Sequence, residues 1–231
     1  MNRIRIIAVV VLVCLAGSTL LIEYPNLSKD YLSIPEQIVQ ATVFVEVESI
    51  NGDFWSGSGF IIREDGLIVT AGHVVNDAKE IKVTTYTGMS LIATEFYGED
   101  YPDSDVGFIK VDWKLLPTLK VASNSNLKYN DTIYICGCPF GKDLAWTLTK
   151  GIVSGFDRIL EGLGKKCLLQ VDSQSWPGNS GGPVCNEQGE VVGILIGGIY
   201  NADGISLCTT SDVLMKALIK YDADKALDGQ I

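Results

Sequence analysis

The sequence is short of positive charge. Its 231 residues hold 18 Lys and Arg against 28 Asp and Glu, a formal net charge of −10, and no run of basic residues occurs. Binding to nucleic acid or to an anionic membrane surface through released counterions requires the opposite sign. We therefore expect no nucleic-acid partner, and the acidic balance points to no other partner.

Histidine is scarcer still, because His73 is the only one. Cys136 and Cys138 are close enough in sequence to suggest a metal site, but a zinc centre needs a second such pair or further histidines. We expect no metal and no cofactor. An oxidising compartment would permit disulfides among the cysteines beyond the N-terminal segment, and burial as small apolar residues is the other interpretation. These cysteines are Cys136, Cys138, Cys167, Cys185 and Cys208.

A long apolar run occurs only at the N-terminus. Residues 6–22 are apolar except for residues 17–19, and two arginines precede them. A basic stretch before an apolar stretch is typical of an export signal, and the run has the minimum length for spanning a bilayer. We expect residues 1–25 to be a cleaved signal or a retained membrane anchor, followed by a connector at 26–37. The rest of the chain would then lie outside the cytoplasm, in the periplasm or secreted.

The remainder of the chain consists of short segments rich in Val, Ile, Thr and aromatic residues. Gly, Pro, Asn-Gly and Asp-Gly separate them, and about a dozen such segments from residue 38 onward predict an all-β sandwich or barrel. One helix is predicted at residues 211–221, capped by Ser211 or Asp212 and packed on the finished barrel through an apolar face. Residues 222–231 are polar, and we expect them to form a flexible tail.

Three residues supply the parts of a nucleophilic site. His73 follows the apolar segment LIVT, and an imidazole both takes and returns a proton near neutral pH. Asp105 leads into the apolar segment VGFIKV, where a buried carboxylate needs a partner such as an imidazole N–H. Ser180 lies in PGNSGGPV, whose glycines allow backbone N–H groups to bind an oxyanion. Taken singly, a lone histidine such as His73 is more often a plain surface or core residue, and the alternative for Asp105 is a turn residue that ends a loop.

Four segments occur in the order LIVTAGHVV, SDVGFIKV, TLTKGIVSGF and PGNSGGPV. Together they resemble the trypsin-like serine peptidases of the chymotrypsin fold, and most closely the HtrA/Deg branch. The resemblance covers residues 38–221 and implies two packed six-stranded β-barrels with a C-terminal α-helix. It places the first barrel at about residues 38–112 and the second at about 125–208. HtrA/Deg proteins carry a PDZ domain after the protease, and we expect none here.

The resemblance also implies a role for each site residue. Ser180 would be the nucleophile, His73 the general acid and base, and Asp105 the carboxylate that orients His73. The backbone N–H groups of Gly178 and Ser180 would form the oxyanion hole. The residues expected to bind the substrate precede the nucleophile or lie in the segment GILIGG: Gln174, Ser175, Ile194, Ile196, Gly197 and Gly198.

The implied activity is that of a serine endopeptidase that works through an acyl-enzyme intermediate, in the quality control or processing of exported polypeptides. With a single histidine, a glutamate-specific pocket that uses a second histidine is excluded. The neutral pocket residues favour small or medium aliphatic side chains before the cleaved bond. Two alternatives are a catalytically silent peptide-binding module and a G-x-S-x-G esterase. We favour the peptidase, because the triad is complete and Ser180 lies among strands rather than βαβ units.

Overall fold

The computed structural model divides the chain into two units, Met1–Ser33 and Ile34–Ile231. The first unit contains a two-stranded antiparallel sheet of β1 (Val9–Leu15) and β2 (Ser18–Tyr24). Across the whole chain the structure describes residues 9–15, 18–24, 32–99, 104–122, 126–159, 168–199 and 202–228. Much of the predicted signal or anchor, namely residues 1–8, 16–17 and 25, lies outside them. Within these ranges no helix is long and apolar enough to cross a membrane.

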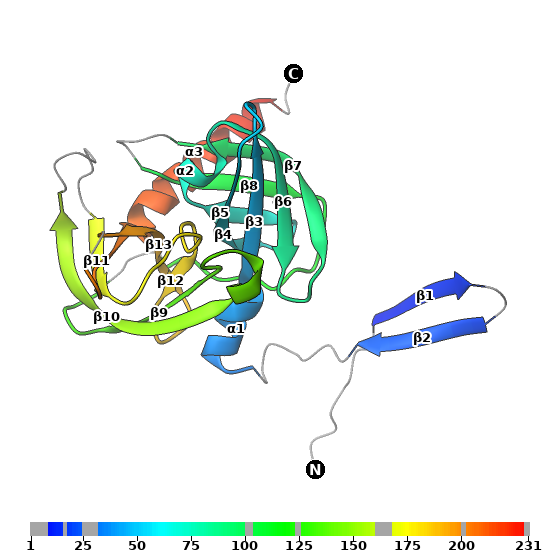
Figure 1. The fold of residues 1–231 in the computed structure, drawn as a ribbon, viewed down its shortest axis with the longest axis horizontal. Coiled ribbons are helices and arrows are strands. Elements are labelled where there is room, and N and C mark those ends of the chain that lie inside the picture. Colours follow the sequence, from blue (N-terminus) through cyan, green and yellow to red (C-terminus); the bar gives the residue numbers. More distant parts are fainter. Residues whose placement is uncertain are drawn as a thin grey trace, which may run out of the picture. The chain divides into compact units, whose positions relative to one another are not determined.

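The second unit contains two closed six-stranded barrels with antiparallel pairing (Figure 1). The strands of the first barrel are β3 (Thr42–Ser49), β4 (Phe54–Arg63), β5 (Leu67–Thr70), β6 (Ala78–Thr85), β7 (Ser90–Gly98) and β8 (Gly107–Val111). Those of the second are β9 (Thr132–Gly137), β10 (Thr147–Arg158), β11 (Leu168–Asp172), β12 (Pro183–Cys185), β13 (Val191–Gly198) and β14 (Ser206–Thr210). Around the barrels the orders are β3-β4-β5-β8-β7-β6 and β10-β11-β14-β13-β12-β9. The predicted all-β double barrel is confirmed.

Helix α1 (Ile34–Ala41) corrects the predicted start of the domain. We expected a connector up to residue 37 and a strand from residue 38, whereas the helix begins inside that connector and the strand begins at Thr42. A short apolar run fits a buried helix turn as well as a strand, so its pattern could not separate the two. Ile38 and Ala41 are fully buried against both barrels, and this tertiary packing favours the helix over the strand.

Helix α3 (Ser211–Asp228) is longer than the predicted 211–221. The expected flexible tail is therefore helical as far as residue 228. Its segment DADKALD contains the good helix formers Ala, Lys and Leu, and Lys225 pairs with Glu95 on β7. The described residues also form two shorter helical turns, α2 (Gly72–Val75) and the 3₁₀ turn η2 (Lys142–Leu144).

Three buried apolar clusters hold the second unit together. One fills the first barrel around Val45 and Ile109 and extends to Leu168 and Leu207 of the second barrel, which has its own cluster around Ile135 and Val171. The third joins both barrels to α1 and α3; it contains Phe60, Ile38, Phe108, Ile194, Leu214 and Tyr221. Because this cluster locks the barrels together, the loops at their junction are held in fixed relative positions.

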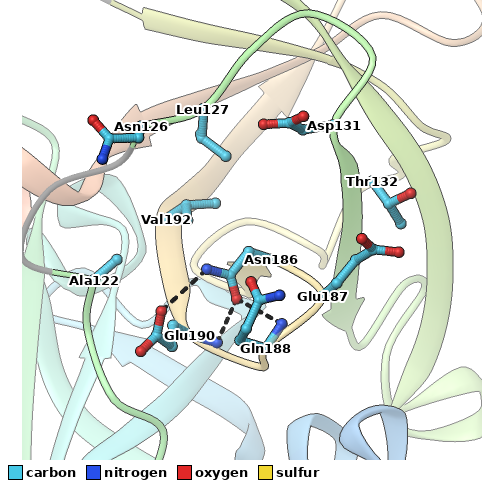
Figure 2. Close-up of a pocket in the computed structure, with 10 residues that line it drawn as sticks. All are labelled: Ala122, Asn126, Leu127, Asp131, Thr132, Asn186, Glu187, Gln188, Glu190 and Val192. Atoms are coloured by element: carbon cyan, nitrogen blue, oxygen red, sulfur yellow. Dashed lines mark hydrogen bonds between the residues drawn. The ribbon is translucent and has the colours of Figure 1, made fainter.

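A hollow of about 330 Å³ opens on the second barrel (Figure 2). Asp131, Glu187 and Glu190 are among the ten residues that line it. The amide of Asn186 is already engaged, because its oxygen accepts the backbone N–H groups of Gln188 and Glu190. None of the lining residues is a predicted site residue, so this hollow is separate from the candidate site.

Candidate active site

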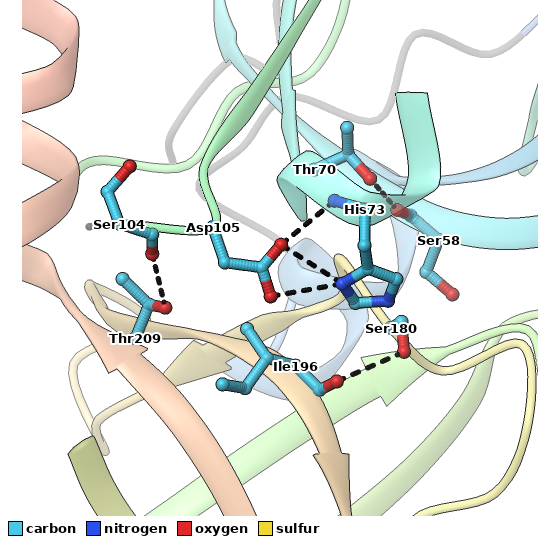
Figure 3. Close-up of polar contacts among 8 residues, drawn as sticks. All are labelled: Ser58, Thr70, His73, Ser104, Asp105, Ser180, Ile196 and Thr209. Carbon is cyan, nitrogen blue, oxygen red and sulfur yellow. Dashed lines mark hydrogen bonds and ion pairs between the residues drawn. The ribbon is translucent and has the colours of Figure 1, made fainter. Parts of the chain in front are cut away.

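His73 and Asp105 lie side by side because neighbouring strands deliver them. His73 belongs to α2, which begins directly after β5, and Asp105 lies just before β8. The two strands pair, with Thr70 opposite Gly107. His73 Nδ1 lies 3.0 Å from each carboxylate oxygen of Asp105, and the His73 backbone N–H donates to Oδ1 at 2.8 Å (Figure 3).

This contact determines which nitrogen of the imidazole carries the proton. The Asp105 carboxylate is fully buried, whereas the His73 side chain is 37% exposed. An ionised carboxylate only accepts hydrogen bonds, so the imidazole proton lies on Nδ1. In the neutral ring Nε2 then has the free lone pair on the exposed side, which is the arrangement a general base needs.

Ser180 completes the group from the second barrel. Its Oγ donates to the backbone carbonyl of Ile196 at 3.4 Å (Figure 3). Among the described residues no hydrogen bond joins this Oγ to His73. A hydroxyl turns about a single bond, and such bonds often form only once a substrate is in place.

Ser58 of the first barrel holds the loop that carries Ser180. Its N–H donates to the Ser180 carbonyl at 2.8 Å, and its Oγ donates to the Gly178 carbonyl at 2.7 Å. The same Oγ accepts the Cys138 N–H at 2.8 Å, and Thr70 Oγ1 donates to the Ser58 carbonyl at 2.7 Å. The sequence alone did not single out this residue, because Ser56, Gly57 and Gly59 surround it and nothing in that pattern marks its hydroxyl as buried.

Two glycines of the loop are required by space as well as by backbone conformation. Gly178 has φ +97° and Gly181 has φ +88°. A Cβ on Gly178 would lie 2.5 Å from the Cys138 carbonyl oxygen, and one on Gly181 would overlap Thr70 and Ser58. Among the described residues the N–H groups of Gly178 and Ser180 donate to no protein acceptor. Two free backbone donors beside a serine hydroxyl can bind an oxyanion.

Comparison with known proteins agrees with this geometry. The profile of the trypsin-like peptidase domain matches residues 57–194. The chain belongs to this family. A probable periplasmic DegP-like serine endoprotease of Pseudomonas putida is 44% identical over 138 residues, 60% of this chain and 28% of that protein. One from Ectopseudomonas mendocina is 37% identical over 175 residues, 76% of this chain and 36% of that protein. The chain thus spans about a third of the length of these relatives.

Two solved structures share the fold of the trypsin-like domain. The HtrA-type protease AlgW, solved with a tripeptide, has a TM-score of 0.73 and 25% identity over 80% of this chain and 61% of that chain. A serine endoprotease from Yersinia pestis has a TM-score of 0.71 and 30% identity over 81% of this chain and 64% of that chain. The predicted similarity to the HtrA branch is confirmed.

The predicted substrate-binding residues of the trypsin-like domain divide into two groups. The Ser180 hydroxyl donates to the backbone carbonyl of Ile196, so Ile196 borders the candidate site, whereas Gln174 is exposed and its role in substrate binding stays a prediction. The expectation that the Ile194 side chain contacts substrate is wrong, because it is fully buried in the cluster between the barrels. Residues two apart lie on one face of a regular strand, but a register shift between Leu195 and Gly197 interrupts β13 at Ile196, and the sequence does not reveal this bulge.

The wall of the expected pocket contains a hydroxyl pair that the sequence analysis missed. Ser206 Oγ lies 2.8 Å from Ser175 Oγ and 2.7 Å from the Ser173 carbonyl. A Cβ on Gly198 would lie 2.7 Å from the Ser175 hydroxyl, so Ser175 and Gly198 are in close contact. Gly197 follows Ile196 on β13. Ser206 was not found because a serine in a strand 26 positions beyond Ser180 gives no local signal.

The cysteines in the described part of this domain are free thiols. Cys136, Cys138, Cys185 and Cys208 are all buried and unpaired. Burial raises the pKa of the Cys136 thiol to about 12 and that of Cys138 to about 11. The interpretation as small apolar residues fits these four, whereas Cys167 lies outside the described residues. Within the described ranges no group of three His, Cys, Asp or Glu side chains could hold a metal ion.

Proposed function

We propose that this chain is a serine endopeptidase in which Ser180 attacks the carbonyl carbon of a peptide bond. His73 Nε2 takes the hydroxyl proton and later gives it to the leaving amine, and Asp105 stabilises the imidazolium between these steps. The observation that carries the proposal is the buried Asp105 carboxylate at 3.0 Å from Nδ1 of the only histidine. That contact leaves Nε2 as the base for the serine.

The N–H groups of Gly178 and Ser180 are the proposed donors to the oxyanion. Negative charge develops on the substrate carbonyl oxygen when Ser180 attacks, and preorganised backbone donors stabilise that charge. The tetrahedral intermediate collapses to an ester between Ser180 and the acyl half of the substrate, and the amine half leaves. His73 then activates a water that cleaves the ester and regenerates the hydroxyl.

The proposed substrates are polypeptides outside the cytoplasm, with small or medium aliphatic side chains before the cleaved bond. Two observations support the location: the basic-then-apolar residues 3–22 and the word periplasmic in the names of the relatives. The hydroxyl of Ser175, which lies against Gly198, supports a small pocket. Cell fractionation tests the location, and the intact chain found soluble in the cytoplasm would refute it.

Kinetics of triad variants test the activity. Ser180→Ala and His73→Ala should each abolish hydrolysis of a fluorogenic peptide library while the circular dichroism spectrum stays native. The double variant should be no slower than either single one, because the residues act as a unit. Substantial hydrolysis by His73→Ala would refute the assignment, since no other histidine could replace it. Peptide binding without any cleavage by the wild type would favour the silent binding module.

A further inference from the structure

A series of side-chain contacts runs from the C-terminal helix to the residue before Asp105. Lys220 on α3 donates to Oε1 of Glu99 at 2.8 Å, and Ser104 Oγ donates to Oε2 of the same carboxylate at 2.6 Å. Glu99 follows β7, and its side chain is only 16% exposed. One carboxylate therefore joins α3 to the immediate neighbour of the proposed catalytic aspartate.

Ser104 is also held from a second direction. Its carbonyl accepts the Thr209 hydroxyl at 3.0 Å, and Thr209 belongs to β14, the strand that leads into α3. On the other side of Asp105, the Val106 carbonyl accepts the Glu99 N–H at 2.9 Å. Glu99 thus contacts the residues on both sides of Asp105. Two residues of the C-terminal elements support these contacts, because Lys220 of α3 bonds to Glu99 and Thr209 of β14 bonds to Ser104.

The backbone of Asp105 needs this support. Its φ is +54°, a left-handed conformation that is unfavourable for a residue with a side chain. Glu99 also packs against the turn that contains His73. Its carbonyl oxygen lies so close to Gly72 that a Cβ at that position would overlap it. Helix α3 also packs on the strand after Asp105, where the rings of Tyr221 and Phe108 have centroids 4.8 Å apart.

We propose that Glu99 and Lys220 are positioning residues that hold Asp105 against His73 through Ser104. This inference rests on the proposed peptidase function, since it concerns the geometry of the proposed catalytic pair. Neither residue contacts the reacting atoms. Lys220 acts through the Glu99 carboxylate, so changes at the two positions affect the same catalytic step.

The kinetic test compares two lysines of α3. Lys220→Ala should lower kcat about three- to fivefold with KM unchanged, the range expected for loss of one partly exposed ion pair. Lys220→Arg should restore kcat, because its guanidinium donates to the same carboxylate. Lys225→Ala is the control, since Lys225 pairs with Glu95 on β7, and it should leave kcat unchanged. Melting temperatures establish that each variant is folded at the assay temperature.

A double variant tests the coupling. Lys220→Ala combined with Glu99→Gln should have the kcat of Glu99→Gln alone, because the other hydrogen bond of the lysine, to the Tyr97 hydroxyl at 3.4 Å, does not involve Ser104 or Asp105. The positioning role is overturned if Lys220→Ala has the kcat of Lys225→Ala, or if the effects of Lys220→Ala and Glu99→Gln simply multiply.

A second measurement does not depend on activity. His73 is the only histidine, so protein labelled with nitrogen-15 histidine gives the NMR signals of a single imidazole. The Nδ1–H signal of the bond to Asp105 should broaden in Lys220→Ala and Glu99→Gln and stay sharp in Lys225→Ala. An unchanged signal in the first two variants would overturn the positioning role. If the signal broadens as expected in the two variants but the wild type hydrolyses no peptide, only the proposed function is refuted.

Discussion

Replacing Ser58 by alanine removes one hydroxyl that bonds two backbone groups at the nucleophile loop. Ser58 is fully buried; its Oγ accepts the Cys138 N–H at 2.8 Å and donates to the Gly178 carbonyl at 2.7 Å. Each backbone group left buried without its partner costs about 1–3 kcal/mol. We expect the free energy of unfolding, measured by urea denaturation, to fall by about 2–4 kcal/mol.

The same change should reduce activity beyond its effect on folding. The Ser58 hydroxyl fixes the Gly178 carbonyl, and Gly178 supplies one of the two proposed oxyanion donors. Loss of one such donor costs about 10²–10³ in kcat. We expect Ser58→Ala to lower kcat about a hundredfold with little change in KM, in a peptide assay at a temperature where the variant is folded. Ser56→Ala, two residues away on the same strand, is the matched control.

A Ser58→Ala variant that kept a kcat within about threefold of the wild type would refute this account of the loop. A variant that lost the same factor as Ser56→Ala would refute it too, because the effect would then belong to the strand. Loss of stability without loss of kcat would show that Ser58 joins the barrels and leaves the oxyanion donors unaffected.

Glu99 should make stability depend on pH: burial raises its pKa, but hydrogen bonds from Lys220 and Ser104 outweigh burial and hold the pKa below the ordinary 4.5. The stabilisation by ionised Glu99 is therefore present above about pH 4.5 and lost as the pH falls through the lowered pKa. Urea denaturation should find the wild type more stable than Glu99→Gln at about pH 7 and equally stable at about pH 2. A difference in stability that persisted in acid would contradict this prediction. Because burial raises the pKa of Cys136 and Cys138 to about 12 and about 11, these thiols should stay unmodified by iodoacetamide at about pH 8 until the chain unfolds. Peptide mass spectrometry reads the outcome, and rapid modification in the folded protein would contradict their burial.

The all-β class and the location of the candidate site were predictable because their signals are local, whereas the double barrel followed from the family resemblance. LIVT ends at a turn that contains His73, and the glycines around Ser180 predict a loop that passes close to other backbone. Asp105 could be singled out because a carboxylate at the start of an apolar strand needs a partner. Each of these inferences uses fewer than ten consecutive residues.

The features that the sequence did not predict depend on contacts between residues that are far apart in the chain. Ser58 bonds to Gly178, and Lys220 bonds to Glu99, over separations of 120 and 121 residues. Residues 34–41 fit a helix or a strand until packing between the barrels buries Ile38. Tertiary packing settled that choice, because a short apolar run has no preference strong enough to settle it alone.

The most direct test of the account is covalent labelling of Ser180. A fluorophosphonate reacts with a serine whose hydroxyl proton is taken by a neighbouring base. Intact-mass and peptide mass spectrometry of the folded protein should show one adduct, on Ser180, that is absent in Ser180→Ala and forms far more slowly in His73→Ala. An adduct on another residue, or equal labelling rates in the wild type and in His73→Ala, would contradict the claim that His73 activates Ser180.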